Sequence, residues 1–201
     1  MPRRVDHDER RRMIAEAIVA IVCARGAEAA SLRAVAAEAG VSMGTVQHYF
    51  TTRDEMLRFA LEYGNGVIAA RLQGLPAGPE PASPREAVRL VFSLLLPLDE
   101  ERAAGARLWA ALIGRACVDE PTRQLAAEAY AGLTAFAVRM LSDALAGTET
   151  GAGDVAQSAR HLVSVVEGLR WPVLFGVYGR DEALGVLDAQ LDLVLGADSG
   201  G

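Results

Sequence analysis

The sequence predicts an all-α protein of about nine helices. Hydrophobic residues make up 51% of the 201 residues, and alanine, a strong helix former, dominates them. Apolar residues recur at helical spacing in most segments, and glycines, prolines or capping residues separate these segments. No segment shows the alternation of polar and apolar residues that is typical of a strand. We expect a three-helix head, residues 1–52, followed by a helical body, residues 53–201.

The first helix is expected to begin near Asp6–Glu9, where acidic residues suit the positive end of the helix dipole. The residues before it, including Arg3 and Arg4, are expected to be irregular. This basic arm either touches nucleic acid or lies in solvent. Gly26 ends the helix, and its apolar face consists of Ile14, Ala17, Ile18, Ile21 and Val22.

Residues 31–50 predict two short helices joined by a tight turn. Ser31 and Ser42 can each cap a helix, because a serine hydroxyl accepts a free backbone N–H at the helix start. Gly40 suits the left-handed conformation that ends the first of these helices. This order is typical of a DNA-binding helix-turn-helix, whose second helix lies in the major groove. The alternative is an ordinary pair of helices within a bundle.

The run AGVSMGTVQHYFTTRDEML, residues 39–57, resembles the signature of TetR/AcrR-type transcriptional regulators. The matching positions are Ala39, Gly40, Val41, Ser42, Gly44, Thr45, Val46, Tyr49, Phe50, Thr52, Arg53, Asp54 and Met56. Gln47 departs from the signature, which usually has a phosphate-contacting tyrosine at this position. The rest of the chain resembles the family in length and helical character.

The resemblance implies a homodimeric regulator, most often a repressor, that a small-molecule effector releases from a palindromic DNA operator. Arg33 would then read a base from the first helix of the motif. Met43, Gly44 and Thr45 would approach base edges at the start of the second helix. The remaining expected DNA contacts are Gln47 and His48, to a base or to phosphate, and Ser31, Tyr49 and Arg53, to phosphate.

A further helix is predicted to start at Arg53, because Thr52 and Glu55 can form a capping box. Gly64 and Gly66 interrupt its pattern. They mark either fraying and close packing or a pliable joint between head and body. The stretch from residue 74 to residue 84 contains four prolines and is the clearest loop.

Five helices are expected beyond this loop. Their approximate ranges are 84–96, 101–117, 121–146, 154–176 and 181–196. The last two carry wide apolar faces that suit either the core of one chain or contact with a second copy. The resemblance implies that these two helices form a four-helix interface between subunits.

The resemblance also implies a cavity for the effector in the body. Its candidate walls are the large or polar side chains Phe92, Trp109, Arg115, Phe136, Arg139, His161, Trp171 and Phe175, with Arg170 and Tyr178 as further candidates. For each aromatic side chain, the alternative is an ordinary place in the helical core.

The formal net charge of −6 belongs to residues 64–201, because residues 1–63 hold nine arginines and nine acidic residues. A neutral head is compatible with DNA binding, since the local placement of arginines matters more than the sum. All 20 basic residues are arginine, which suits phosphates and guanine edges.

We expect no enzymatic activity, no cofactor and no metal site. The sequence has no glycine-rich phosphate loop, zinc-protease motif, CxxC pair or nucleophile elbow. No signal peptide or membrane-spanning run is evident, so the protein is expected to be cytoplasmic, with Cys23 and Cys117 as reduced, buried thiols.

Two alternatives to a ligand-released repressor remain open at this stage. One is a related activator or a regulator that needs no ligand. The other is a helical ligand-binding or interaction protein whose DNA-binding motif is degenerate, an interpretation that Gln47 and the neutral head favour.

Overall fold

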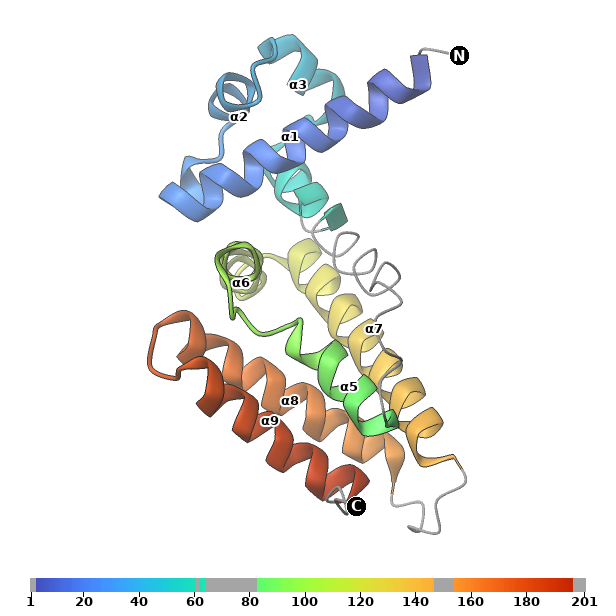
Figure 1. Ribbon diagram of the computed structural model, residues 1–201. Helices are drawn as coiled ribbons and strands as arrows, with labels where there is room; N and C mark the ends of the chain where they lie inside the picture. Colours follow the sequence, from blue (N-terminus) through green and yellow to red (C-terminus); the bar gives the residue numbers. More distant parts are fainter. Residues whose placement is uncertain (1–2, 61, 64–82, 147–153, 197–201) are drawn as a thin grey trace. The chain divides into compact units, whose positions relative to one another are not determined.

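The computed structural model describes residues 3–60, 62–63, 83–146 and 154–196, and all regular structure within these ranges is helical (Figure 1). This confirms the all-α prediction. The chain forms two compact units. The first unit comprises residues 1–74 and 104–124, and the second comprises residues 75–103 and 125–201. A functional boundary at residue 52 stays a prediction.

The first unit opens with α1, Arg3–Arg25, and the short 3-10 helix η1, Ala27–Ala29. The expected irregular arm was wrong, since the helix already begins at Arg3. No glycine or proline lies between Arg3 and Arg25. Without such a helix-breaking residue, the helix can begin before Asp6, the first residue at which it was expected. The expected apolar face is buried, and its members Ile14, Ala17, Ile18, Ile21 and Val22 are at most 5% exposed.

Two short helices follow α1 in this unit, α2 at Leu32–Glu38 and α3 at Met43–Tyr49. A further helical stretch covers residues 53–60. Its predicted capping box is confirmed. The Glu55 N–H donates to Thr52 Oγ1 over 3.2 Å, and the Thr52 N–H donates back to Glu55 Oε2 over 3.2 Å.

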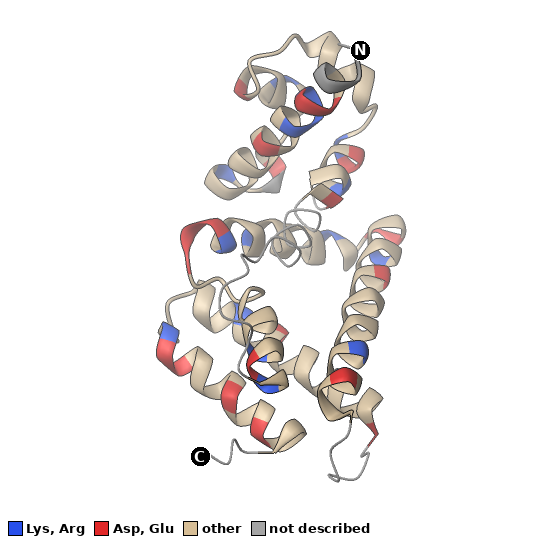
Figure 2. Cartoon of the chain, turned by 45° about the vertical axis from the view of Figure 1, so that its right-hand side comes forward, with Lys and Arg blue, Asp and Glu red and all other residues tan. Residues whose placement is uncertain are grey.

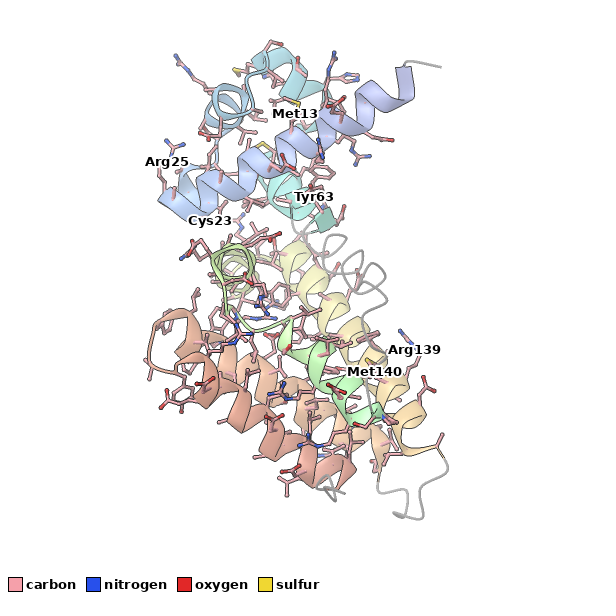
Figure 3. The ribbon with its side chains drawn as sticks, viewed as in Figure 1. Met13, Cys23, Arg25, Tyr63, Arg139 and Met140 are labelled. Carbon is pink, nitrogen blue, oxygen red and sulfur yellow. The ribbon has the colours of Figure 1, made fainter. Side chains whose placement is uncertain are left out.

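Most of α6, Glu100–Ala116, also belongs to the first unit. The Cys23 thiol of α1 donates to the Ala104 carbonyl over 3.3 Å, and Figure 3 shows Cys23 near the end of α1. Both cysteines are free thiols, but Cys117 is exposed, so its expected burial was wrong. Cys117 comes directly after the last residue of α6. The buried face of that helix ends with Leu112 and Ala116 and does not include Cys117.

The second unit is built from α5, Pro84–Ser93, most of α7, Glu120–Leu145, and the pair α8, Val155–Leu174, and α9, Arg180–Leu195. α8 packs against α9, and α5 packs against α9 (Figure 1). Their shared core is apolar and includes Val88, Phe92, Leu141, Leu162, Val166, Leu187 and Leu191.

Ion pairs fasten α5 to α9 along the edge of this core. Acidic residues recur along α9 (Figure 2). Asp188 pairs with Arg89 over 2.5 Å, and Asp192 pairs with Arg85 over 2.5 Å. The charged face of α9 therefore serves partly to hold α5 in place.

The five helices expected in the body are all present, and most of their ends lie within two residues of the predicted ones. α5 is the exception, since it ends at Ser93 and not near residue 96. The N–H groups of Leu94, Leu95 and Leu96 each donate to the carbonyl three residues earlier, so the chain continues there as tight turns and not as α-helix. Gly64, Gly66, the loop from residue 74 through residue 82 and residues 147–153 lie outside the described residues. Among the helices that the structure describes, none combines the length and apolar character needed to cross a bilayer.

Candidate DNA-binding site

The turn between α2 and α3 has the geometry that its sequence predicts. Ser31 Oγ accepts the Ala34 N–H over 3.2 Å, and Ser42 Oγ accepts the Thr45 N–H over 3.1 Å. Gly40 has a φ of +65°, the left-handed conformation that a side chain makes costly. Both helix starts are therefore capped, and the chain reverses at a residue suited to the turn.

A small apolar core holds the two helices together. Val35 and Val46 are fully buried, and Ala36, Ala39 and Phe50 are at most 8% exposed. α2 packs against α3 and against α1. A helix of seven residues is not stable alone in water, so this packing is what keeps α3 helical.

The opposite side of α3 faces solvent. Met43 is 46% exposed, and Gly44, Gln47 and His48 are also exposed. Thr45 is half-buried, and its hydroxyl lies 2.8 Å from Ser42 Oγ, so it also supports the helix start. Most of the expected base-contacting residues thus lie on one accessible face, and their contacts with DNA stay a prediction.

Tyr49 lies in a cluster of rings at the end of α3. Its ring centroid is 4.9 Å from that of His7 on α1 and 5.4 Å from that of His48. The side chain is half-buried. The contact with His7 joins residues 42 positions apart, and no sequence pattern indicated it. Through this contact, His7 of α1 lies beside α3, which already carries His48.

Two further expected DNA contacts lie outside α3. Arg33 is exposed on α2. Ser31 is exposed at the start of α2, where its hydroxyl serves as the helix cap. Because that hydroxyl already accepts a backbone N–H, a phosphate contact would have to use its proton.

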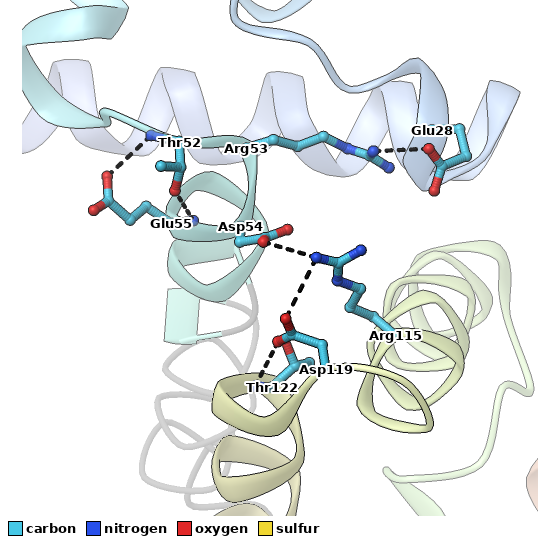
Figure 4. Close-up of polar contacts among 8 residues, drawn as sticks. All are labelled: Glu28, Thr52, Arg53, Asp54, Glu55, Arg115, Asp119 and Thr122. Carbon is cyan, nitrogen blue, oxygen red and sulfur yellow. Dashed lines mark hydrogen bonds and ion pairs between the residues drawn. The ribbon is translucent and has the colours of Figure 1, made fainter.

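Arg53 pairs with a residue that the sequence reasoning missed. Its Nη1 donates to Glu28 Oε2 of η1 over 2.7 Å (Figure 4). This hydrogen bond lowers the pKa of the Glu28 carboxyl and raises the pKa of Arg53. The expected phosphate contact is therefore already bound to an anion of its own chain.

Next to this pair, Arg115 at the end of α6 connects two carboxylates. Its Nη2 lies 3.1 Å from Asp54 Oδ2 and 3.4 Å from Asp119 Oδ1 (Figure 4). Asp119 also accepts the Thr122 N–H over 2.9 Å, at the start of α7. Arg115 was expected in the effector cavity, and the structure shows it in this surface network of the first unit.

The other candidate cavity residues are spread over several environments. Phe92 is fully buried and its ring lies 6.4 Å from that of Phe136, which the Arg139 guanidinium contacts at 5.8 Å. Arg139 itself is exposed on α7 (Figure 3). Trp109 and Trp171 are half-buried. These positions stay predictions for effector binding.

Phe175, Tyr178 and His161 lie on the surface as well, and Arg170 is buried. Phe175 is 72% exposed, and the exposed His161 makes a hydrogen bond with Gln157 over 2.8 Å. Arg170 is only 8% exposed and pairs with Glu167 over 2.8 Å. In the part of the chain that the structure describes, no three His, Cys, Asp or Glu side chains come together as a metal site.

The capped pair α2 and α3, with an exposed face on the second helix, defines a helix-turn-helix protein of the DNA-binding class. Comparison with known proteins agrees with this class. Residues 14–59 match the tetR family of bacterial regulatory proteins, and residues 84–196 match the C-terminal part of BetI-type transcriptional repressors. The chain belongs to the TetR family of bacterial regulators, with a body of the BetI type.

Individual relatives are regulators as well. The chain is 36% identical over 109 residues to the HTH-type transcriptional regulator PksA of Bacillus subtilis, a match that covers 54% of this chain and 52% of PksA. The match thus spans about half the length of PksA. The family and PksA are transcriptional regulators and not enzymes, as the sequence predicts.

Solved structures match over nearly the whole chain. A transcriptional regulator from Rhodococcus sp. is 31% identical, with a TM-score of 0.78 and coverage of 95% of this chain and 99% of the other. A putative transcriptional regulator from Saccharomonospora viridis, solved in complex with choline, has 21% identity, a TM-score of 0.75 and coverage of 92% and 94%. The second likeness shows the fold alone.

Proposed function

We propose that this protein is a cytoplasmic, homodimeric transcriptional repressor that binds a palindromic operator through α3 and leaves it when a small-molecule effector binds. The observation that carries the proposal is the exposed face of a capped and packed α3. Met43, Gly44, Gln47 and His48 are all accessible there. An exposed helix face that packing holds in place suits the major groove, which admits one α-helix.

The proposed contacts divide into two classes. Arg33 and the exposed residues of α3 would read base edges. Ser31, Tyr49 and Arg53 would contact phosphates and fix the orientation of the head. Gln47, which replaces the usual tyrosine of the family signature, adds an amide that can donate to and accept from a base edge.

The dimer is proposed to form through α8 and α9. On α9, Gly185, Val186, Ala189 and Leu193 are exposed along one face, and Leu193 is 83% exposed. A Cβ added at Gly185, or at Gly168 of α8, would meet no atom of this chain within 4 Å. Packing within the chain does not explain these helix glycines, which cost about 1 kcal/mol each relative to alanine. Close approach of a second copy would explain them.

A homodimer presents two copies of α3 to DNA. Its half-sites should lie about one helical turn apart, roughly 34–36 Å, in an inverted repeat. An effector would release the operator by binding better to a conformation of the dimer in which the two α3 helices no longer match this spacing.

Choline is the first effector to test. The body matches BetI-type repressors, and the Saccharomonospora viridis regulator of the same fold was solved with choline. The test compares operator binding in the presence of a quaternary ammonium compound and of a primary amine of similar size. Weaker binding with the first compound alone would identify the effector class. Equal binding with and without choline would leave the operator function standing and remove this effector.

The DNA-binding proposal is tested by selection from a random duplex library. We expect the purified protein to enrich an inverted repeat. Arg33→Ala should then cost about 1–3 kcal/mol of binding and relax the preference at one base pair of each half-site. Arg25→Ala, an exposed arginine at the end of α1, is the matched control and should preserve that preference. A library that remains unenriched after selection would contradict the proposal.

A further inference from the structure

We propose that Glu28 acts as an internal substitute for a DNA phosphate, so that Arg53 must exchange the Glu28 carboxylate for phosphate when the protein binds DNA. The inference rests on the proposed DNA-binding function and adds a residue that lowers and tunes the affinity. Glu28 lies outside the helix-turn-helix, on η1 between α1 and α2.

The geometry of the pair is that of a strong charged hydrogen bond. Arg53 Nη1 and Glu28 Oε2 are 2.7 Å apart, within the range of guanidinium–carboxylate contacts (Figure 4). The two residues are 25 positions apart in the chain, so the contact depends on how η1 and the helical stretch 53–60 are placed within the first unit. A phosphate oxygen makes the same kind of contact with arginine as a carboxylate oxygen does.

The exposure of the two side chains indicates that the pair can exchange. Glu28 is 91% exposed and Arg53 is 32% exposed. A carboxylate in water forms an ion pair that salt screens and that contributes little to stability. A DNA phosphate belongs to a dense row of charges with condensed counterions, so it competes strongly for the same guanidinium.

Arg53 already donates to Glu28 through Nη1. Its Nε is buried, and the structure gives it no hydrogen-bond partner. The neighbouring backbone donors are also taken, because the Thr51 and Thr52 N–H groups donate to Glu55 Oε2 over 2.6 Å and 3.2 Å. Carboxylates of the chain thus occupy Arg53 Nη1 and the two backbone donors just before this helix, which would otherwise be open to a phosphate.

The exchange has two measurable consequences. Glu28→Gln removes the competing charge, so binding should tighten roughly twofold to fivefold, the size expected for a surface ion pair. The gain should be the same for any duplex, because phosphate contacts carry no base information. The slope of log affinity against log salt should change little, because Arg53 neutralises one phosphate in both proteins once the exchange has taken place.

The test compares five proteins by fluorescence anisotropy: the wild type, Glu28→Gln, Glu38→Gln, Arg53→Gln and the double variant Glu28→Gln with Arg53→Gln. Glu38, an exposed glutamate of α2, provides the same change of charge in the same unit. Each protein is titrated with the selected duplex and with a scrambled duplex, between about 50 and 200 mM salt. Circular dichroism melting checks that each variant is folded.

We expect Glu28→Gln to tighten both duplexes more than Glu38→Gln does, and to lose this excess when Arg53 is also replaced. Glu28→Gln that behaves like Glu38→Gln, or that weakens binding, would overturn the inference while selective binding by the wild type still supports the proposed function. A wild type that binds neither duplex would overturn both.

Discussion

Arg170 and Glu167 form an ion pair inside the second unit, one turn apart on α8. Arg170 Nη1 lies 2.8 Å from Glu167 Oε1, and the two side chains are 10% and 12% exposed. The Tyr130 hydroxyl of α7 donates to Glu167 Oε2 over 3.0 Å. Burial lowers the pKa of Arg170, and the Glu167 carboxylate opposes this effect. This charged cluster therefore depends on all its members to offset desolvation.

Replacing only Glu167 should destabilise the protein strongly. Glu167→Leu removes a carboxylate partner from a buried guanidinium and is expected to cost about 3–5 kcal/mol of unfolding free energy. Adding Arg170→Met should recover part of that loss, because it removes the buried charge, while the Tyr130 hydroxyl has still lost Glu167 as its acceptor. Urea unfolding followed by circular dichroism measures both. Glu128→Leu, at an exposed position of α7, is the control. A loss for Glu167→Leu no larger than for Glu128→Leu would show that the cluster is not tightly coupled.

Gly44→Ala should separate stability from DNA binding. A Cβ at Gly44 would lie 3.8 Å from Ser42 Oγ, an ordinary contact, so the fold does not require glycine there. Alanine is the better helix former by up to about 1 kcal/mol, and the variant should be as stable as the wild type or more stable.

Its DNA affinity should nevertheless fall at least roughly tenfold if α3 approaches the DNA closely at this residue, a loss of about 1.4 kcal/mol. Gly132→Ala on α7 is the matched control, because a Cβ there fits without a clash as well and meets no atom within 4 Å apart from its chain neighbours and its own helix backbone. It should leave DNA binding unchanged. Full DNA affinity in Gly44→Ala would place the close contact elsewhere on the head.

The Asp119 carboxylate should make stability depend on acid pH. The hydrogen bond from the Thr122 hydroxyl, with the Thr122 N–H and Arg115, lowers the pKa of Asp119 in the folded protein. Because this pKa is lowered, the Asp119 carboxylate stabilises the folded protein at any pH above the ordinary aspartate pKa, about 3.9. This stabilisation is lost as the pH falls through the pKa of Asp119 in the folded protein.

Asp119→Asn should therefore lower the urea midpoint at pH 7, and the gap to the wild type should narrow at about pH 3. Asp143→Asn, at an exposed position of α7, gives the baseline for replacing an aspartate. A gap of constant size across this range would mean that the charge of Asp119 does not contribute to its role at the start of α7.

Leu193→Asp should dissociate the proposed dimer. Leu193 is 83% exposed on α9, and a carboxylate there would have to be desolvated against a second copy. Sedimentation velocity should show a dimer for the wild type and a monomer for the variant at the same concentration. Val118→Asp replaces another exposed aliphatic side chain, at 79% exposure and outside α8 and α9 in the sequence, and should stay dimeric. A dimeric Leu193→Asp would move the interface off this face.

Local sequence signals predicted the elements of this fold well. The caps at Ser31 and Ser42, the left-handed Gly40 and the capping box at Thr52 all follow from contacts within four residues. Such contacts depend on backbone chemistry that each residue type carries with it. The start of α1 was missed because a helix without a breaking residue can extend through several positions.

Contacts between distant residues could not be predicted in the same way. The pairs Glu28–Arg53 and Asp54–Arg115 join positions 25 and 61 residues apart. Arginine and acidic residues are common along this chain, so its sequence alone does not indicate which of them meet. The burial of Arg170 could not be predicted either. Arginine is almost never fully buried unless it is paired, and the sequence around Arg170 did not indicate that it would be.

Operator-selective DNA binding is tested most directly by fluorescence anisotropy of the purified protein with DNA from upstream of its own gene, beside a scrambled duplex at several salt concentrations. We predict tight, sequence-selective binding whose affinity falls steeply with salt. Equally weak binding to both duplexes, and to the sequences recovered by random selection, would contradict DNA recognition by α3 and favour a helical ligand-binding protein.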